Sequence, residues 1–253
     1  MRKFALTFSV VAGLAAAGSA KAADIPLKAP PPAAPMMSWT GCYLAGGVGY
    51  GMWNQDHFGE TLPGNAQLTA STTSGGRGWL GRVGAGCDYQ FAPSWVVGVF
   101  GDYDFADVSG FADISGIGGP EKMSAAWAVG GRIGYLPYPN LMTYVSGGWT
   151  QARFDQVNLL ATPVVPAPAL GLHLPEHTYS GWFLGTGFEY AAPWFRGLFW
   201  RTEYRFAQYD ADDIPILVTG TGAQTGLGVH SEKFVQTITS SLVWKFNWPG
   251  SRH

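Results

Sequence analysis

Apolar and polar residues alternate with a two-residue period in eight segments of the chain. In each segment bulky apolar side chains share one face, and glycine, polar or charged residues share the other, a pattern typical of β-strands. The segments are 40–52, 77–90, 95–105, 123–135, 141–153, 178–191, 198–209 and 233–247. Each is long enough to cross a bilayer as a tilted strand, which needs about 9–11 residues. The pattern is weakest in the fifth segment, 141–153.

The connections between these segments alternate in length. Three are short, at 91–94, 136–140 and 192–197, and four are long, at 53–76, 106–122, 154–177 and 210–232. Outer-membrane barrels have short periplasmic turns and long outer loops, and their sheets close because an open edge in hydrocarbon leaves backbone groups unpaired. The sequence therefore predicts an all-β fold: an eight-stranded antiparallel up-and-down transmembrane β-barrel with short periplasmic turns and four long extracellular loops.

The composition agrees with this prediction. Aromatic residues make up 15% of the chain, charged residues only 13%, and there are 36 glycines. A lipid-facing barrel spreads its apolar residues along strands in this way. Tyr and Trp residues near the predicted strand ends fit the aromatic girdles found at the two membrane interfaces. They are Tyr43, Trp79, Tyr89, Trp95, Tyr135, Trp149, Tyr190, Trp200 and Trp244.

The first residues predict export. A basic start, an apolar run over 4–18 and a small-residue pattern at Ala20-Lys21-Ala22 are typical of a cleaved signal peptide over 1–22, with a short membrane anchor as the alternative. A Pro/Ala-rich periplasmic linker (23–38), the outer-membrane barrel (39–247) and a C-terminal tail (248–253) follow. Removing Arg2, Lys3 and Lys21 leaves 12 of the 15 basic residues against 17 acidic ones, a net charge of −5. This acidic balance argues against a nucleic-acid partner.

Most of the charged residues in the predicted strands lie on the inward face. They are Arg82, Asp88, Asp102, Arg132, Glu189, Arg201, Glu203, Arg205 and Lys245. An eight-stranded barrel is just wide enough to be filled by side chains, and buried charges must be paired. Two interpretations follow: a salt-bridged plug, or a narrow path for small solutes.

The two cysteines, Cys42 and Cys87, fall on neighbouring predicted strands. If the first hairpin is symmetric about Pro63-Gly64-Asn65, residues whose numbers sum to 129 face each other, and the two cysteines form such a pair on the lipid face. The periplasm is oxidising, so a disulfide is one prediction. Two free thiols that act as small apolar residues are the other.

Several motifs resemble catalytic or metal sites but lack the required context. The stretch 173–177 matches H-x-x-E-H, but Pro175 interrupts the helix that this zinc pattern needs. The neighbours His230, Ser231 and Glu232 cannot converge as a hydrolase triad on one strand. No phosphate-loop pattern accompanies the glycines at 46–51. We therefore predict no catalytic, cofactor or metal site and no enzymatic activity.

Two outer loops have features that suggest contacts. Asp210, Asp212 and Asp213 form either a solvated acidic loop or a place for divalent cations shared with lipopolysaccharide. The loop 159–174 is unusually apolar for an exposed segment, which favours adhesion or packing against a neighbouring molecule.

Three parts of the sequence resemble the small outer-membrane β-barrel proteins of alphaproteobacteria, a porin-like group of surface antigens. They are the opening strand W-T-G-C-Y-L-A-G-G-V-G-Y-G (39–51) with the Pro-rich stretch before it, the segment 181–190, and R-T-E-Y-R-F (201–206). Two features depart from that family: Cys42 stands where its members tend to have Phe, and seven residues follow Phe246, where its members usually end on an aromatic that signals barrel assembly.

The resemblance implies an outer-membrane location and a structural, surface-exposed role in envelope integrity, with no catalytic residues to carry over. A narrow porin-like channel is the alternative, and a lipid-modifying barrel enzyme comes third. The expected partners are outer-membrane lipid, lipopolysaccharide and the barrel-assembly machinery. The sequence leaves the oligomeric state open.

Overall fold

The computed structural model describes residues 38–162 and 164–246. The predicted signal peptide, nearly all of the predicted linker and the C-terminal tail lie outside these residues. The described part contains eleven strands: β1 (Gly41–Thr61), β2 (Thr72–Ala92), β3 (Trp95–Ile114), β4 (Ile117–Tyr138), β5 (Leu141–Phe154), β6 (Val157–Ala161), β7 (Ala169–Leu174), β8 (His177–Ala191), β9 (Leu198–Tyr209), β10 (Asp212–Val218) and β11 (Gln224–Phe246). It includes no helix that is long and apolar enough to span a membrane.

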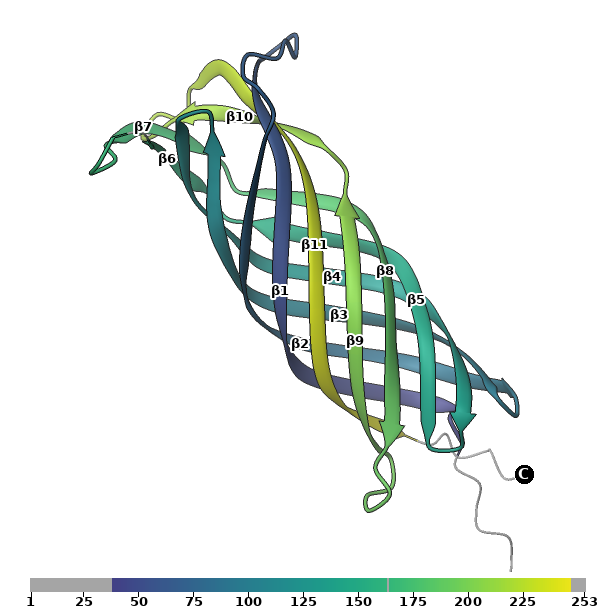
Figure 1. Ribbon diagram of the computed structural model, residues 1–253. Helices are drawn as coiled ribbons and strands as arrows, with labels where there is room; N and C mark the ends of the chain where they lie inside the picture. The colour runs from purple at the N-terminus through teal and green to yellow at the C-terminus, as the bar shows by residue number, and fades with distance from the viewer. Residues whose placement is uncertain (1–37, 163, 247–253) are drawn as a thin grey trace, which may run out of the picture. The chain divides into compact units, whose positions relative to one another are not determined.

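Eight of the strands form a closed antiparallel ring in the order β1-β2-β3-β4-β5-β8-β9-β11, and β11 pairs back onto β1. The strands are strongly tilted relative to the axis of the barrel (Figure 1). The short connections at 93–94, 139–140 and 192–197 lie where the sequence predicts turns. The predicted eight-stranded up-and-down barrel is therefore confirmed.

The strands are longer than the alternation predicts, because they continue beyond the membrane. The predicted loops 53–76 and 106–122 are largely strand: β1 runs to Thr61, and β3 and β4 meet in a tight turn after Ile114. The other two long loops contain β6, β7 and β10, which gather at the extracellular end (Figure 1). Outside the bilayer the outer face meets water, so the outward residues become polar while the backbone ladder continues. On β1 this change comes after Met52, where the outward residues become Asn54 and Asp56.

The outward face of the ring is apolar, as the pattern predicts. Val48, Trp79, Val99, Leu184 and Leu242 are among its exposed residues. Charged, polar and small residues face inward along the middle of most strands, whereas large apolar residues face inward toward the strand ends. In β5, Met142 and Tyr144 are buried inside the barrel while Thr143 faces outward, so its alternation is weak in the sequence.

Two predicted lipid-facing residues lie inside the barrel instead. The sequence predicts Tyr43 in an aromatic girdle, but this residue is 2% exposed and lies beside the guanidinium groups of Arg132 and Arg201. The alternation over 123–135 predicts Met123 on the apolar outer face, but this residue is fully buried. The register of β4 shifts between Met123 and Ala125, and such a bulge turns the residues beyond it to the other face.

Two apolar clusters fill the barrel interior on either side of a charged middle. On β9 the inward residues run from Phe199 in the periplasmic cluster, through the charged positions 201, 203 and 205, to Ala207 in the extracellular cluster. On β3 the same order runs from Val96 to Ala106. The charged side chains are therefore enclosed between apolar layers.

Candidate functional site: the charged barrel interior

All nine charged residues predicted to face inward do so, and the structure brings them together in two groups. The central charge group consists of Arg82, Asp102, Asp104, Glu203 and Arg205. The periplasmic charge group consists of Asp88, Arg132, Glu189, Arg201 and Lys245. Their side chains are at most 12% exposed. The alternation of the strands points these side chains into the lumen, and inward-facing glycines leave room for them. A Cβ on Gly98, for example, would clash with the Asp88 carboxylate.

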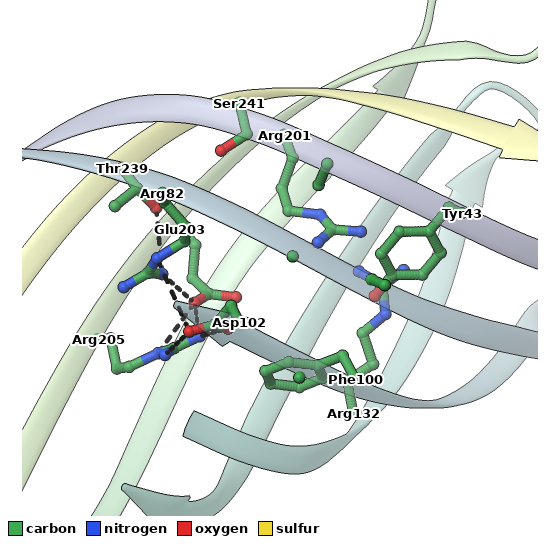
Figure 2. Close-up of a pocket in the computed structure, with 14 residues that line it drawn as sticks. Tyr43, Arg82, Phe100, Asp102, Arg132, Arg201, Glu203, Arg205, Thr239 and Ser241 are labelled. Atoms are coloured by element: carbon green, nitrogen blue, oxygen red, sulfur yellow. Dashed lines mark hydrogen bonds and ion pairs between the residues drawn. The ribbon is translucent and has the colours of Figure 1, made fainter. Parts of the chain in front are cut away.

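Two arginines organise the central charge group. Arg82 on β2 binds both carboxylate oxygens of Asp104 on β3, with Nε–Oδ1 and Nη2–Oδ2 distances of 2.6 and 2.7 Å. Arg205 on β9 binds both oxygens of Asp102, at 2.9 and 2.8 Å. Glu203 Oε1 joins the two halves, at 3.2 Å from Arg82 Nη1 and 2.7 Å from Arg205 Nη2 (Figure 2). Bidentate pairs of this kind fix the geometry of both partners.

The periplasmic charge group connects five strands. Arg132 on β4 binds Asp88 on β2 at 2.9 and 2.6 Å and reaches Glu189 on β8 at 3.1 Å. Arg201 Nη2 on β9 lies 2.7 Å from Glu189 Oε2. Lys245 on β11 lies 2.9 Å from both Asp88 and Glu189. These ion pairs tie together strands on opposite sides of the lumen.

The charges of the two groups balance only when both are taken together. The central charge group has two cations and three anions, and the periplasmic charge group has three cations and two anions. Asp104 supplies the fifth anion. It is not among the nine predicted residues, although it stands two positions after Asp102 and so shares the inward face of the segment 95–105. The nine residues alone would carry one unpaired positive charge, which also points to a further anion.

A third buried ion pair lies on the extracellular side and was also missed. Lys233 Nζ is 2.6 Å from Glu121 Oε1, hydrogen-bonds Gln55, and lies 4.2 Å from the ring centre of Phe154. Trp53 and Tyr179 complete the aromatic surroundings of this ammonium group. The sequence predicts a loop over 106–122, so it gives no reason to place Glu121 in the interior.

The internal space left between these side chains is small. Three cavities inside the barrel have volumes of about 20 Å³ each. Arg82, Asp102 and Arg205 lie between the two cavities next to the central charge group. A space of this size holds about one water molecule.

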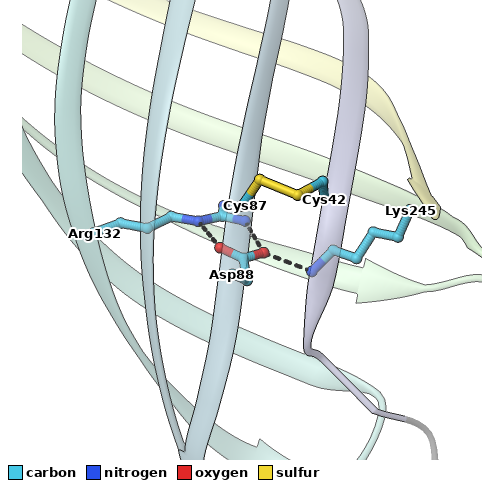
Figure 3. Close-up of a disulfide and its surroundings, with 5 residues drawn as sticks. All are labelled: Cys42, Cys87, Asp88, Arg132 and Lys245. Carbon is cyan, nitrogen blue, oxygen red and sulfur yellow. Dashed lines mark hydrogen bonds and ion pairs between the residues drawn. A yellow bond between two sulfur atoms is a disulfide. The ribbon is translucent and has the colours of Figure 1, made fainter. Parts of the chain in front are cut away.

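A disulfide joins Cys42 and Cys87 outside the barrel wall. The two residues are paired in the β1–β2 register, which follows the predicted symmetry about residues 63–65. The bond lies on the lipid-facing side, and the next residue in the chain, Asp88, points inward to Arg132 and Lys245 (Figure 3). The first hairpin is thus covalently closed beside the periplasmic charge group.

The sequence motifs that resemble catalytic sites do not assemble. His173 lies on β7 and contacts Thr219, whereas His177 lies on β8 and contacts Asp212, so the H-x-x-E-H residues have different partners. Ser231 is buried, and its neighbour His230 binds Asp213 instead. Of the acidic loop residues, Asp212 and Asp213 therefore each have a histidine partner.

A closed ring of eight tilted strands with an apolar outer face and an ion-paired interior defines a small outer-membrane β-barrel protein. The sequence is 32% identical over 195 residues to the 31 kDa outer-membrane immunogenic proteins of Brucella melitensis biotype 1 and Brucella suis biovar 1, covering 72% of this chain and 79% of each relative. The chain belongs to this family of outer-membrane surface antigens, as its resemblance predicts, and it is a protein of the bacterial outer membrane.

A solved structure supports the fold independently of close sequence similarity. The outer membrane protein OprG from Pseudomonas aeruginosa matches with a TM-score of 0.53 at 11% identity, covering 83% of this chain and 99% of that one. At this identity the likeness concerns the fold alone. No family model matches the sequence.

Proposed function

We propose that this protein is a non-enzymatic, non-conducting barrel that stabilises the outer membrane and presents its extracellular strands and loops to the outside. The observation that carries the proposal is the filled lumen. Ten charged side chains form two paired groups across it, between two apolar layers. A solute would have to separate bidentate ion pairs in a poorly solvated interior, and leaving one partner of such a pair alone costs about 3–5 kcal/mol.

Recording from planar bilayers tests this proposal against the narrow-channel alternative. We expect the purified protein to give no steady conductance, while a general porin in the same bilayers conducts. A double variant, Arg82→Ala with Arg205→Ala, removes both arginines of the central charge group and should admit ions if it folds. Steady wild-type channels would overturn the proposal in favour of a pore, and their loss in Glu203→Ala or Arg205→Ala would place that pore at the central charge group.

An assay of lipid hydrolysis tests the third possibility, a lipid-modifying enzyme. The divergence of Ser231 and His230 speaks against a hydrolase site built from these residues. We expect no release of fatty acid from lipopolysaccharide or phospholipid by the purified protein. Turnover that scales with protein concentration and disappears in Ser231→Ala would contradict the non-enzymatic part of the proposal.

The surface role is supported by the extracellular strands. The hairpin of β6 and β7 ends in an apolar tip, where Val165 is 94% exposed and Val164 and Leu170 are exposed as well. We propose that this tip contacts another molecule at the cell surface, and that the apolar belt contacts membrane lipid and lipopolysaccharide. Deleting residues 163–172 should abolish binding of cells to that partner while the barrel still folds. Unchanged adhesion of the deletion strain would contradict a role for the tip.

A further inference from the structure

Glu60 is a buried carboxylate near the end of β1, beyond the membrane. The residue is 1% exposed, and its Oε1 has no hydrogen-bond partner among the residues that the structure describes. The following turn folds back over it: Gln67 forms a bridge with Glu60, and Leu62 N–H donates to the Gly226 carbonyl. An unpaired buried carboxylate is costly, so a positive partner at this position would be strongly stabilising.

Two other potential ligands converge on this carboxylate from β10 and β11. Asp213 lies opposite His230 in the β10–β11 pairing, and Phe58, two residues before Glu60, lies opposite His230 in the β1–β11 pairing. As a result, one ligand atom each of Glu60, Asp213 and His230 lies within 4.8 Å of the other two. The His230 Nδ1 atom is 2.6 Å from Asp213 Oδ1.

The ligands are held in place by neighbours outside the cluster. The ring of Phe58 stacks on that of His230, with 4.8 Å between the centroids. The amide of Asn65 donates a hydrogen bond to Asp213 Oδ2. Outer-shell contacts of this kind orient the ligands in metal sites.

The electrostatics of the cluster favour a cation. Two carboxylates face a single imidazole, which leaves an excess of negative charge even when His230 is protonated. A cation between the three groups would stabilise the buried Glu60 carboxylate and offset its repulsion with Asp213.

We propose that Glu60, Asp213 and His230 form an extracellular binding site for a divalent transition metal, with Zn²⁺ as its representative. One imidazole nitrogen with two carboxylate oxygens is a donor set that suits Zn²⁺ and its neighbours, whereas Ca²⁺ and Mg²⁺ prefer oxygen ligands only. Three protein ligands leave a coordination position open for water or for a group from another molecule. The site is independent of whether the lumen conducts.

Calorimetric titration of the folded full-length protein in detergent micelles, after treatment with a chelator, tests the proposal. We expect one Zn²⁺ to bind per chain at neutral pH. Glu60→Gln and His230→Gln should each weaken binding by about 100-fold or more, because loss of an outer-shell partner alone costs roughly 10–100-fold. Asn65→Ala, which removes an outer-shell partner, should weaken Zn²⁺ binding by roughly 10–100-fold. Ca²⁺ should not compete at equal concentration.

A second histidine–aspartate pair at the extracellular end of the barrel provides the matched control. His177 Nε2 lies 2.8 Å from Asp212 Oδ2, but this pair is not part of the three-ligand cluster. His177→Gln should therefore bind Zn²⁺ as the wild type does. Equal affinity in Glu60→Gln or His230→Gln, no saturable binding by the wild type, or equal affinity for Ca²⁺ would overturn the proposal.

Thermal unfolding of the wild type keeps the test decisive if a ligand variant fails to fold. Zn²⁺ should raise the melting temperature of the wild-type protein, because a ligand that binds only the folded state stabilises it by mass action. Mg²⁺ at the same concentration should not raise it. The absence of a Zn²⁺-dependent shift would contradict the site.

Discussion

Cys42 and Cys87 face each other across β1 and β2 and are joined by a disulfide on the lipid side of the barrel wall. On the inner side of the same stretch of β2, Asp88 binds Arg132 and Lys245. A covalent link and an ion-paired network therefore hold the same part of the wall from its two faces. The sequence alone left the bonded and free states of the cysteines open.

Removing the disulfide should destabilise the barrel without preventing its closure. The link joins residues 45 positions apart, and restricting the unfolded chain over such a loop is worth about 2–4 kcal/mol. The variant with Cys42→Ala and Cys87→Ala should therefore unfold at lower guanidinium concentration in micelles, as followed by tryptophan fluorescence. Reduction of the wild type should give the same shift. Identical midpoints for reduced and oxidised protein would argue against a stabilising role.

Glu189 should be the most sensitive member of the periplasmic charge group. It is fully buried and contacts three cations, Arg132, Arg201 and Lys245. Glu189→Ala would leave these cations with Asp88 as the one anion of the group, and breaking a buried network costs about 3–5 kcal/mol. Chemical unfolding should show this loss.

The exposed pair Arg153 and Glu176 is the control for Glu189. Both side chains are about half exposed, at 53% and 48%. Exposed pairs contribute little to stability because solvent screens them. Glu176→Ala should leave the unfolding midpoint unchanged within error. A comparable loss in both variants would show that the effect does not depend on burial.

Glu60 should make stability depend on pH when no metal is present. Burial and the neighbouring Asp213 raise its pKa in the folded state above its ordinary value. The protonated form is thus favoured by folding, so this contribution is fully present below the unfolded pKa and is lost as pH rises through the folded pKa. Glu60→Gln should remove this component of the decline in melting temperature, and saturating Zn²⁺ should offset the loss in the wild type. A Glu60→Gln profile parallel to that of the wild type would contradict this assignment.

How much of the molecule the sequence predicts depends on what surrounds each strand. In the bilayer, lipid requires one face of each strand to be apolar, so the eight membrane-crossing segments can be recognised in the sequence. The charged residues on their opposite faces, such as Arg82 in 77–90 and Arg205 in 198–209, can therefore be assigned to the interior. Beyond the membrane that constraint disappears. The segment 106–114 still alternates, but Ala106, Val108, Ala112 and Ile114 face inward and polar residues face water, which is the reverse of the lipid-facing pattern. Lys233 and Glu121 pair in the same extracellular part of the barrel, where no apolar outer face marks the strands. The Glu60 cluster combines three such extracellular strand segments, and only their registers bring its members together.

The depth at which β1 leaves the membrane can be tested with two residues on its outward face. Val48 is 64% exposed within the apolar belt, whereas Asn54 lies beyond Met52, where the outward residues become polar. An arginine on the lipid face near the bilayer midplane costs about 2–4 kcal/mol, and the cost falls to about 0–1 near the interface. Val48→Arg should therefore lower the free energy of unfolding in lipid vesicles by about 2–4 kcal/mol, and Asn54→Arg by about 0–1 kcal/mol. Equal costs would place the upper membrane boundary elsewhere on β1. In detergent micelles the difference should shrink, because a micelle deforms around the charge more readily than a bilayer does.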